Sequence, residues 1–160
     1  MNNKVSLQFL DPKDLPAISY ALDESQSRFT ATVEKAMSMI RERNTEDAFP
    51  VTIFNDGQPV GFFILDFGDD KFELTDTQNS VLIRSLSVNP QMQGKGIGKE
   101  AMIQVDDFVR KHFKDCHEIV LAVNQKNESA YHIYRTAGYS YEGKTRIGRS
   151  GPQYLMYKKF

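Results

Sequence analysis

The chain has 160 residues, of which 40% are hydrophobic and eleven are phenylalanine, so it can fold as one domain with a substantial core. Its formal net charge is −1, with acids and bases interspersed, which argues against a globally basic nucleic-acid-binding surface. A single cysteine, Cys116, excludes an internal disulfide, and no apolar run approaches the ~20 residues of a membrane-spanning helix. Because no signal-peptide pattern is present either, we expect a cytoplasmic protein of one domain over residues 1–160 that binds neither nucleic acid nor membrane.

Hydrophobic periodicity and turn residues predict a mixed α/β order of elements. Alternating or continuous apolar runs indicate strands, and apolar residues three and four positions apart indicate helices. In chain order, the predicted elements are strand 5–9, helices 15–22 and 32–43, strands 51–54, 60–67 and 81–88, helix 97–113, strand 118–123, helix 127–137, and strands 139–147 and 153–159. We expect strands 81–88 and 118–123 to be parallel neighbours, because the long helix between them forms a right-handed β-α-β crossover.

Three local signals add detail to this order. Asp14 is placed to cap helix 15–22, and residues 25–30 are expected to form a polar break before the next helix. The sequence Asn55-Asp56-Gly57-Gln58 lies between two strands and is a strong signal for a hairpin. The polar, acid-rich stretch 68–80 is long for a loop in a compact domain, which favours a functional role.

Residues 81–102 contain the pattern that is most informative about function. Strand 81–88 ends at Asn89-Pro90, and a helical pattern begins about ten residues later. Between them, glycine occupies three alternate positions: Gly94, Gly96 and Gly98. Glycines permit positive φ angles and remove Cβ atoms that would hold a ligand away. Free amides at a helix start, with the helix dipole behind them, favour an anion such as phosphate. The alternative interpretation is an ordinary turn that starts a helix.

The residues around these glycines exclude three other glycine motifs. A P-loop needs Ser or Thr directly after its Gly-Lys pair, and neither Gly-Lys pair in this loop is followed by one. The dinucleotide-binding fingerprint would need glycine where Lys99 stands. A KH-type Gly-x-x-Gly clamp is also absent, because no glycine lies three residues after any of the three.

The loop does match the pattern Gln/Arg-x-x-Gly-x-Gly/Ala. The matching segment is Gln91-Met92-Gln93-Gly94-Lys95-Gly96, directly after a strand that ends in Leu86-Ser87-Val88. This segment resembles the acyl-CoA pyrophosphate loop of the GNAT superfamily of N-acetyltransferases.

A second segment, about 30 residues further along, also resembles this superfamily. Taken alone, it is typical of an amphipathic helix with a buried tyrosine. The residues that match the second GNAT signature, in its order and at its spacing, are Leu121, Val123, Asn127, Ala130, Tyr134, Gly138 and Tyr139. The two signatures together identify the chain as resembling a GNAT N-acetyltransferase over nearly its whole length.

The resemblance implies a fold and a cofactor. It implies a single GNAT-like α/β domain whose mixed, mostly antiparallel sheet of about seven strands is flanked by about four helices. The sheet would be splayed between strands 81–88 and 118–123, which makes a wedge for the pantetheine arm of acetyl-CoA. The residues that the resemblance assigns to this cofactor are Leu86, Ser87, Val88, Gln91, Gln93, Gly94, Lys95, Gly96, Ile97, Gly98, Lys99, Asn127, Ala130 and Tyr134.

The resemblance also implies a mechanism, in which a neutral amine attacks the acetyl thioester directly. The backbone N–H of Val88 is the natural donor to the oxyanion, and Tyr134 matches the family position for the general acid that protonates the leaving thiolate. The general base stays unassigned, because no carboxylate lies between Val81 and Val88. Glu73 and Asp76 in the preceding loop are candidates for it or for an acidic rim, although a solvated loop is the simpler explanation of both.

Substrate recognition in the family comes from the first two helices, the loop before the central strand and the final hairpin. Here the residues in or near these segments that are candidates for substrate contact are Asp23, Glu24, Phe29, Thr30, Phe62, Phe63, Glu73, Arg84, Ser85 and Tyr154. Acidic and aromatic residues would suit a cationic amine such as a polyamine or an amino sugar. We expect no metal, because the three histidines, His112, His117 and His132, lack obvious ligand partners.

The leading hypothesis is therefore an acetyl-CoA-dependent N-acetyltransferase that acts on a primary amine of a small molecule. The alternatives are acetylation of a protein lysine or N-terminus, and a non-catalytic acyl-CoA-binding sensor. The first alternative requires a groove that the 68–80 loop leaves open. We expect a monomer or a homodimer.

Overall fold

A computed structural model describes residues 4–160, apart from the side chain of Ser25. The strands are β1 Val5–Phe9, β2 Ala48–Asn55, β3 Gln58–Asp66, β4 Ser80–Val88, β5 Glu118–Asn124, β6 Ser140–Gly148 and β7 Gly151–Lys159. The α-helices are α1 Leu15–Ile18, α2 Glu24–Ser27, α3 Val33–Arg43, α4 Ile97–His112 and α5 Glu128–Thr136. The 3-10 turns are η1 Pro12–Asp14, η2 Asp69–Glu73 and η3 Pro90–Met92.

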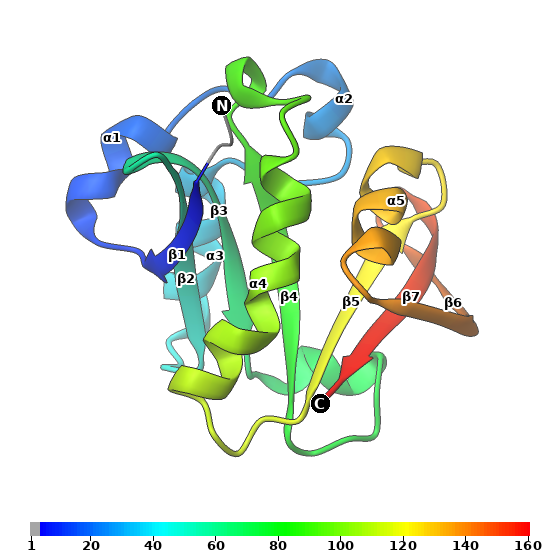
Figure 1. The fold of residues 1–160 in the computed structure, drawn as a ribbon. Helices are drawn as coiled ribbons and strands as arrows, with labels where there is room; N and C mark the ends of the chain where they lie inside the picture. The colour runs from blue at the N-terminus through cyan, green and yellow to red at the C-terminus, as the bar shows by residue number, and fades with distance from the viewer. Residues whose placement is uncertain (1–3) are drawn as a thin grey trace.

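The strands form one seven-stranded sheet in the order β1-β2-β3-β4-β5-β7-β6. The neighbours β4 and β5 are parallel, and the other neighbouring pairs are antiparallel. The predicted mixed α/β fold and its parallel central pair, joined through α4, are therefore confirmed (Figure 1). Within residues 4–160, no helix is long and apolar enough to cross a membrane.

The region before β2 differs from its prediction. Helix α1 ends at Ile18, four residues before the predicted end of this helix. The first residues of the stretch 25–30, which was expected to be a break between helices, belong to the short helix α2. Asp14 does stand before α1, but its carboxylate makes no capping bond there. It accepts hydrogen bonds from the Asp11 N–H at 3.1 Å and the Thr52 hydroxyl at 3.0 Å, which fasten η1 to the sheet. The hairpin between β2 and β3 is as predicted, with Asp56 and Gly57 at φ 50° and 81°.

The sheet opens between its two parallel strands. Their pairing comprises only the residues Ser80–Leu82 of β4 and the residues 118–120 of β5. After this point β5 continues to pair with β7, whereas β4 follows β3, and Figure 1 shows the two strands diverging toward the top. The β3–β4 register shifts between Phe62 and Ile64, opposite Ser85, which has φ 62°. This β-bulge bends β4 away from β5 and confirms the predicted splay.

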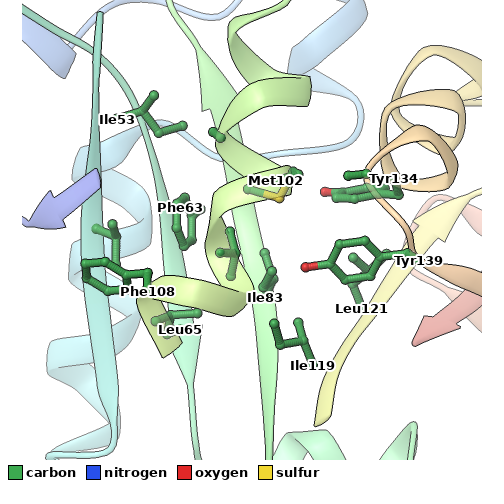
Figure 2. Close-up of a cluster of buried hydrophobic side chains, with 14 of the residues drawn as sticks. Ile53, Phe63, Leu65, Ile83, Met102, Phe108, Ile119, Leu121, Tyr134 and Tyr139 are labelled. Carbon is green, nitrogen blue, oxygen red and sulfur yellow. The ribbon is translucent and has the colours of Figure 1, made fainter. Parts of the chain in front are cut away.

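The two faces of the sheet carry different cores. Helices α4 and α5 cover one face, where a large apolar cluster includes Ile83, Met102 and Leu121 (Figure 2). On the other face, α1 and α3 pack against Phe62 and Ile64 of β3. Farther along that second face, a smaller cluster joins Leu74, just after η2, to β4, β5 and β7. The end of β4 is thus held between two packed layers.

Gly61 on β3 is required by the close approach of β3 to the end of β4. A Cβ atom at Gly61 would lie 2.5 Å from the carbonyl oxygen of Ser87, which is backbone and cannot turn aside. We expect Gly61→Ala to lower the free energy of unfolding by about 1–3 kcal/mol in chemical denaturation. The matched control is Gly98→Ala in α4, where the nearest atom would be 3.7 Å away and stability should not fall. Equal stability of the two variants would contradict this account.

Candidate active site

The glycine loop forms an open cradle between β4 and α4. Asn89 begins it, with a side chain that accepts a hydrogen bond from the N–H of Gln91 at 3.0 Å. Gly94 and Gly96 both have φ +78°, and no atom lies within 4 Å of the Cβ that either would carry in another residue. Helix α4 follows without a side-chain cap, so its first N–H groups remain available. These features fit a phosphate-bearing ligand, because its oxygens can approach the loop backbone directly.

Most of the predicted cofactor residues in this loop are exposed to solvent. Lys95 and Lys99 are exposed beside the cradle, as are Gln91 and Gln93, whereas Ile97 is buried beneath it. The two lysines therefore place positive charge near the cradle even though the chain as a whole has a charge of −1.

Side chains hold the end of β4, and two of them, Tyr20 and Gln26, were not among the residues predicted for the site. The carbonyl oxygen of Val88 accepts hydrogen bonds from the amide of Gln26 at 3.3 Å and from that of Gln93 at 3.2 Å. One residue earlier, the Ser87 hydroxyl lies 2.8 Å from that of Tyr20. Gln26 and Tyr20 lie more than 60 positions before these partners, so no local sequence pattern could have linked them.

Tyr134 lies across the wedge, on α5. The side chain of Asn127 caps this helix by accepting a hydrogen bond from the N–H of Ala130 at 3.2 Å. Tyr134 is 7% exposed, and among residues 4–160 its hydroxyl has no hydrogen-bond partner. Figure 2 shows this hydroxyl directed toward Met102 on α4. Burial raises the pKa of Tyr134, so the phenol keeps its proton at neutral pH.

A basic side chain fixes the spacing of α4 and α5. Lys158 of β7 donates to the Ala137 carbonyl at the end of α5, at 2.8 Å, and to the Asp106 carboxylate of α4, at 3.2 Å. Its ammonium also lies 5.4 Å from the ring centre of Tyr139. This single cation therefore links the two helices on either side of the predicted pantetheine wedge.

A hollow lies on the other face of the sheet, beside the bulge in β4. Its volume is about 290 Å³, and it is lined on its apolar side by Met39, Ile40 and Ile64. Arg84 and Ser85, two of the predicted substrate residues, also line it. Because it borders β4 where that strand leaves β5, the hollow is a candidate for an acceptor site.

The charged wall of the hollow is organised around Asp66. Its side chain has no exposed surface and receives a hydrogen bond from Arg43 at 2.7 Å and one from Arg84 at 2.9 Å. Arg84 also contacts Asp70 at 3.0 Å, and Arg43 contacts Asp47. Counting Glu42, three carboxylates and two guanidinium groups line the hollow, which gives it a net negative charge that favours a cation.

Several predicted substrate residues lie elsewhere. Phe63 was expected to contact the substrate, and this is wrong: it has no exposed surface and belongs to the core beneath α4. Phe62 is equally buried, against α1 and α3. Tyr154 packs against Tyr131 and Tyr141 on the α5 side of the sheet, away from the hollow. Strand alternation explains these corrections, because neighbouring residues on a strand point to opposite faces.

The other predicted substrate residues border the acceptor face without forming a cluster. Phe29 and Thr30 lie half-buried between α2 and α3, and Asp23 caps α2 through the N–H of Gln26. Glu24 is exposed in the first turn of α2. The candidate base Glu73 is exposed and ion-paired with Arg146 of β6 at 2.7 Å, and Asp76 is exposed. Within residues 4–160, no group of His, Cys, Asp and Glu side chains is arranged to hold a metal.

Asp66 should make stability depend on pH. Burial raises the pKa of its carboxyl, but the hydrogen bonds that it accepts, that of Arg43 the strongest, outweigh burial and hold the pKa below its usual value. The folded-state pKa is thus lower than the unfolded value of about 4. This carboxylate therefore contributes stability above pH ~4 that is lost as the pH falls through its folded-state pKa.

We expect Asp66→Asn to lower the free energy of unfolding at pH 7 by about 1–3 kcal/mol, because two guanidinium groups lose a charged acceptor. The difference from the parent protein should shrink below pH 4, as measured by urea denaturation across pH. Asp107→Asn is the control, because Asp107 is exposed and its ion pair with Arg110 contributes little. A difference that is as large at pH 3 as at pH 7 would contradict the assignment.

Comparisons with known proteins agree with this geometry. The sequence model of the Acetyltransferase (GNAT) family matches residues 16–139. The chain is 35% identical over 159 residues to a Bacillus subtilis (strain 168) protein named "Uncharacterized N-acetyltransferase YbbJ", and the match covers 98% of each chain.

Solved structures share the fold at low sequence identity. The aminoglycoside acetyltransferase AAC(6')-Ib, in complex with coenzyme A and kanamycin, superimposes with a TM-score of 0.78 at 21% identity, over 98% of this chain and 95% of that one. Spermidine N-acetyltransferase from Vibrio cholerae, in complex with coenzyme A and spermine, gives a TM-score of 0.71 at 18% identity, over 97% and 95%. With the family match, these findings show that the chain belongs to the GNAT family of acetyltransferases.

Proposed function

We propose that this protein transfers the acetyl group of acetyl-CoA to a primary amine of a small molecule, by direct attack on the thioester. The observation that carries the proposal is the open glycine cradle at the end of a splayed strand, with a buried phenol across the wedge. An anion site, an unpaired strand edge and a protonated acid thus lie along one path. The solved relatives in complex with coenzyme A support this assignment of the path.

Each part of the path has a binding role. The amides of residues 93–99 hold the pyrophosphate, with charge added by Lys95 and Lys99. The edge of β4 that β5 leaves unpaired offers backbone groups of Leu86 and Val88 to the pantetheine amides. In the structure, the side-chain amides of Gln26 and Gln93 donate to the Val88 carbonyl. When the cofactor binds, a pantetheine amide replaces them. Asn127 and Ala130 border the cofactor from α5.

Bound acetyl-CoA supplies the thioester carbon that the amine attacks. The N–H of Val88 donates to the carbonyl oxygen as it gains charge. When the carbon–nitrogen bond has formed, the carbon–sulfur bond breaks and its electron pair goes to sulfur. The hydroxyl of Tyr134 gives its proton to that sulfur, while nitrogen loses a proton to solvent. Water then returns a proton to Tyr134.

Three features favour a small amine over a protein lysine. The hollow is acidic and partly apolar, which suits an aliphatic or amino-sugar cation. The loop 68–80 is fixed across the lower end of the acceptor face, where Lys71 bonds two carbonyls of the same loop and the Leu74 carbonyl accepts from Tyr157 at 2.7 Å. The relatives of known structure act on an aminoglycoside and on spermidine.

A thiol-release screen tests this function. Purified protein and acetyl-CoA are incubated with polyamines, aminoglycosides, amino acids and peptides, and free coenzyme A is measured. We expect release with at least one small cationic amine at a higher kcat/KM than with any lysine peptide. Release that occurs only with peptides would establish the protein alternative, and coenzyme A binding without release for any amine would establish the sensor alternative.

The cradle assignment predicts the effect of a charge within it. Gly96→Glu places bulk and negative charge at the pyrophosphate position and forces a left-handed conformation on glutamate. We expect the Kd for coenzyme A, measured by calorimetry, to rise at least about 100-fold, a change of about 2.7 kcal/mol. The control is Gly143→Glu, because Gly143 also has positive φ and open surroundings but lies on β6. Equal Kd values for the two variants would refute the cradle.

The acid assignment predicts a defect in kcat. Tyr134→Phe removes the proton donor but keeps the ring, so we expect kcat to fall about 100-fold while the KM for acetyl-CoA changes less than about twofold. Since burial raises the pKa of Tyr134, the parent enzyme should show no loss of kcat from ionisation of this phenol up to about pH 10. Full activity of the variant would refute the role of Tyr134 as the general acid.

A further inference from the structure

Tyr139 is a buried tyrosine whose hydroxyl makes no hydrogen bond, among the described residues, that would stabilise the fold. It is 2% exposed, and within residues 4–160 its hydroxyl lacks a hydrogen-bond partner. A buried hydroxyl in this condition destabilises the fold, and phenylalanine would fill the same volume without that cost. The other deeply placed tyrosine outside the wedge, Tyr157, does bond, to the Leu74 carbonyl. Stability alone therefore does not explain why a tyrosine, and not a phenylalanine, occupies this position.

The chain couples Tyr139 rigidly to Tyr134. Helix α5 ends in a Schellman motif. The N–H of Tyr139 donates to the carbonyl of Tyr134 at 3.0 Å, and the N–H of Gly138 donates to the carbonyl of Arg135 at 3.1 Å. Gly138 has φ +100°, the left-handed conformation that this motif needs. The ring centres of the two tyrosines are 5.7 Å apart, with 67° between their planes. The position of one phenol is therefore set by the other.

Both phenols point the same way. Figure 2 shows the hydroxyls of Tyr134 and Tyr139 directed side by side toward α4 and β4, with Ile83 and Ile119 below them. The two hydroxyls lie on neighbouring rings, whose centres are 5.7 Å apart. A water that bridges two polar groups serves each of them almost as well as a direct hydrogen bond. The surroundings are otherwise apolar, which makes an unassisted phenolate costly.

Two charged groups complete the environment. Lys158 lies against the ring of Tyr139, and its ammonium is bonded to the Asp106 carboxylate. These groups hold the rings in place, but their hydrogen bonds are directed to each other and to the end of α5. The hydroxyl of Tyr139, on the neighbouring ring, is therefore a candidate hydrogen-bond donor toward Tyr134.

We propose that Tyr139 is a positioning residue whose hydroxyl, through one water, hydrogen-bonds the phenolic oxygen of Tyr134 and orients its proton toward the leaving sulfur. This inference rests on the proposed acid role of Tyr134. When sulfur takes the proton and the carbon–sulfur electron pair settles on it, the charge left on the Tyr134 oxygen is stabilised by the donated hydrogen bond. The charge disappears when solvent returns the proton.

Tyr139→Phe separates this role from a structural one. We expect kcat, with the amine identified by thiol release, to fall about five- to tenfold, whereas both KM values stay within twofold. The midpoint of thermal unfolding should stay the same or rise, because the variant loses a hydroxyl without a protein partner. Lower activity together with undiminished stability is a result that a packing role would not produce. A kcat within twofold of the parent enzyme would overturn the inference.

A double-mutant cycle supplies the second test. If Tyr139 acts through Tyr134, the variant Tyr134→Phe/Tyr139→Phe should have the kcat of Tyr134→Phe alone, within twofold. Independent losses that multiply would overturn the coupling. Full kcat in Tyr134→Phe would refute the acid role itself, which distinguishes failure of the proposed mechanism from failure of this inference alone.

The matched control is Tyr157→Phe, on the other face of the sheet. This change removes a hydroxyl that does have a partner, the Leu74 carbonyl at 2.7 Å. We expect a lower unfolding midpoint and a kcat within twofold of the parent enzyme at saturating amine, the reverse of the pattern for Tyr139→Phe; any effect through the 68–80 loop should appear in the KM for the amine. If both variants lost activity in proportion to stability, loss of tyrosine hydroxyls in general would account for the effect, and the positioning role would be refuted.

Discussion

The parting of β4 from β5 after Leu82 is the constraint on which the site depends. Backbone N–H and C=O groups in a sheet normally satisfy one another, so a strand edge left open inside a domain needs other partners. Here β5 keeps its partner β7, while the bulge at Ser85 lets β4 follow β3. The edge so exposed runs directly into the glycine cradle. One irregularity of the backbone therefore links the anion site to the wedge.

The two faces beside this opening have opposite chemistry. On the side of α4 and α5, apolar packing encloses Tyr134 and keeps its phenol protonated. On the other side, Asp66 gathers two guanidinium groups from α3 and β4 and leaves the hollow net negative. A phosphate-bearing donor and a cationic acceptor would thus approach from environments that suit each of them. The low net charge of the chain conceals this local separation.

The alignment of α5 depends on contacts at its end. Lys158 satisfies the Ala137 carbonyl and also pairs with Asp106 on α4, and the Schellman motif turns Tyr139 back onto Tyr134. These interactions act at a helix C-terminus, where carbonyls lack internal partners and a cation is favourable. The rigidity of the acid side of the site therefore comes from capping and packing beyond the helix itself.

The local sequence was enough to predict the order of strands and long helices and the hairpin at Asp56-Gly57, because these depend on periodicity and turn residues. Contiguous motifs were also the basis for predicting the glycine cradle, Asn127 and Tyr134 as site residues. Which side chains share a face depends on the folding of distant segments together. The tertiary structure buried Phe63, moved Tyr154 to the α5 side, and brought Tyr20 to Ser87 and Arg43 to Asp66. A bulge reverses strand alternation beyond it, and contacts between distant segments leave no local pattern, so the acceptor side could not be read in advance.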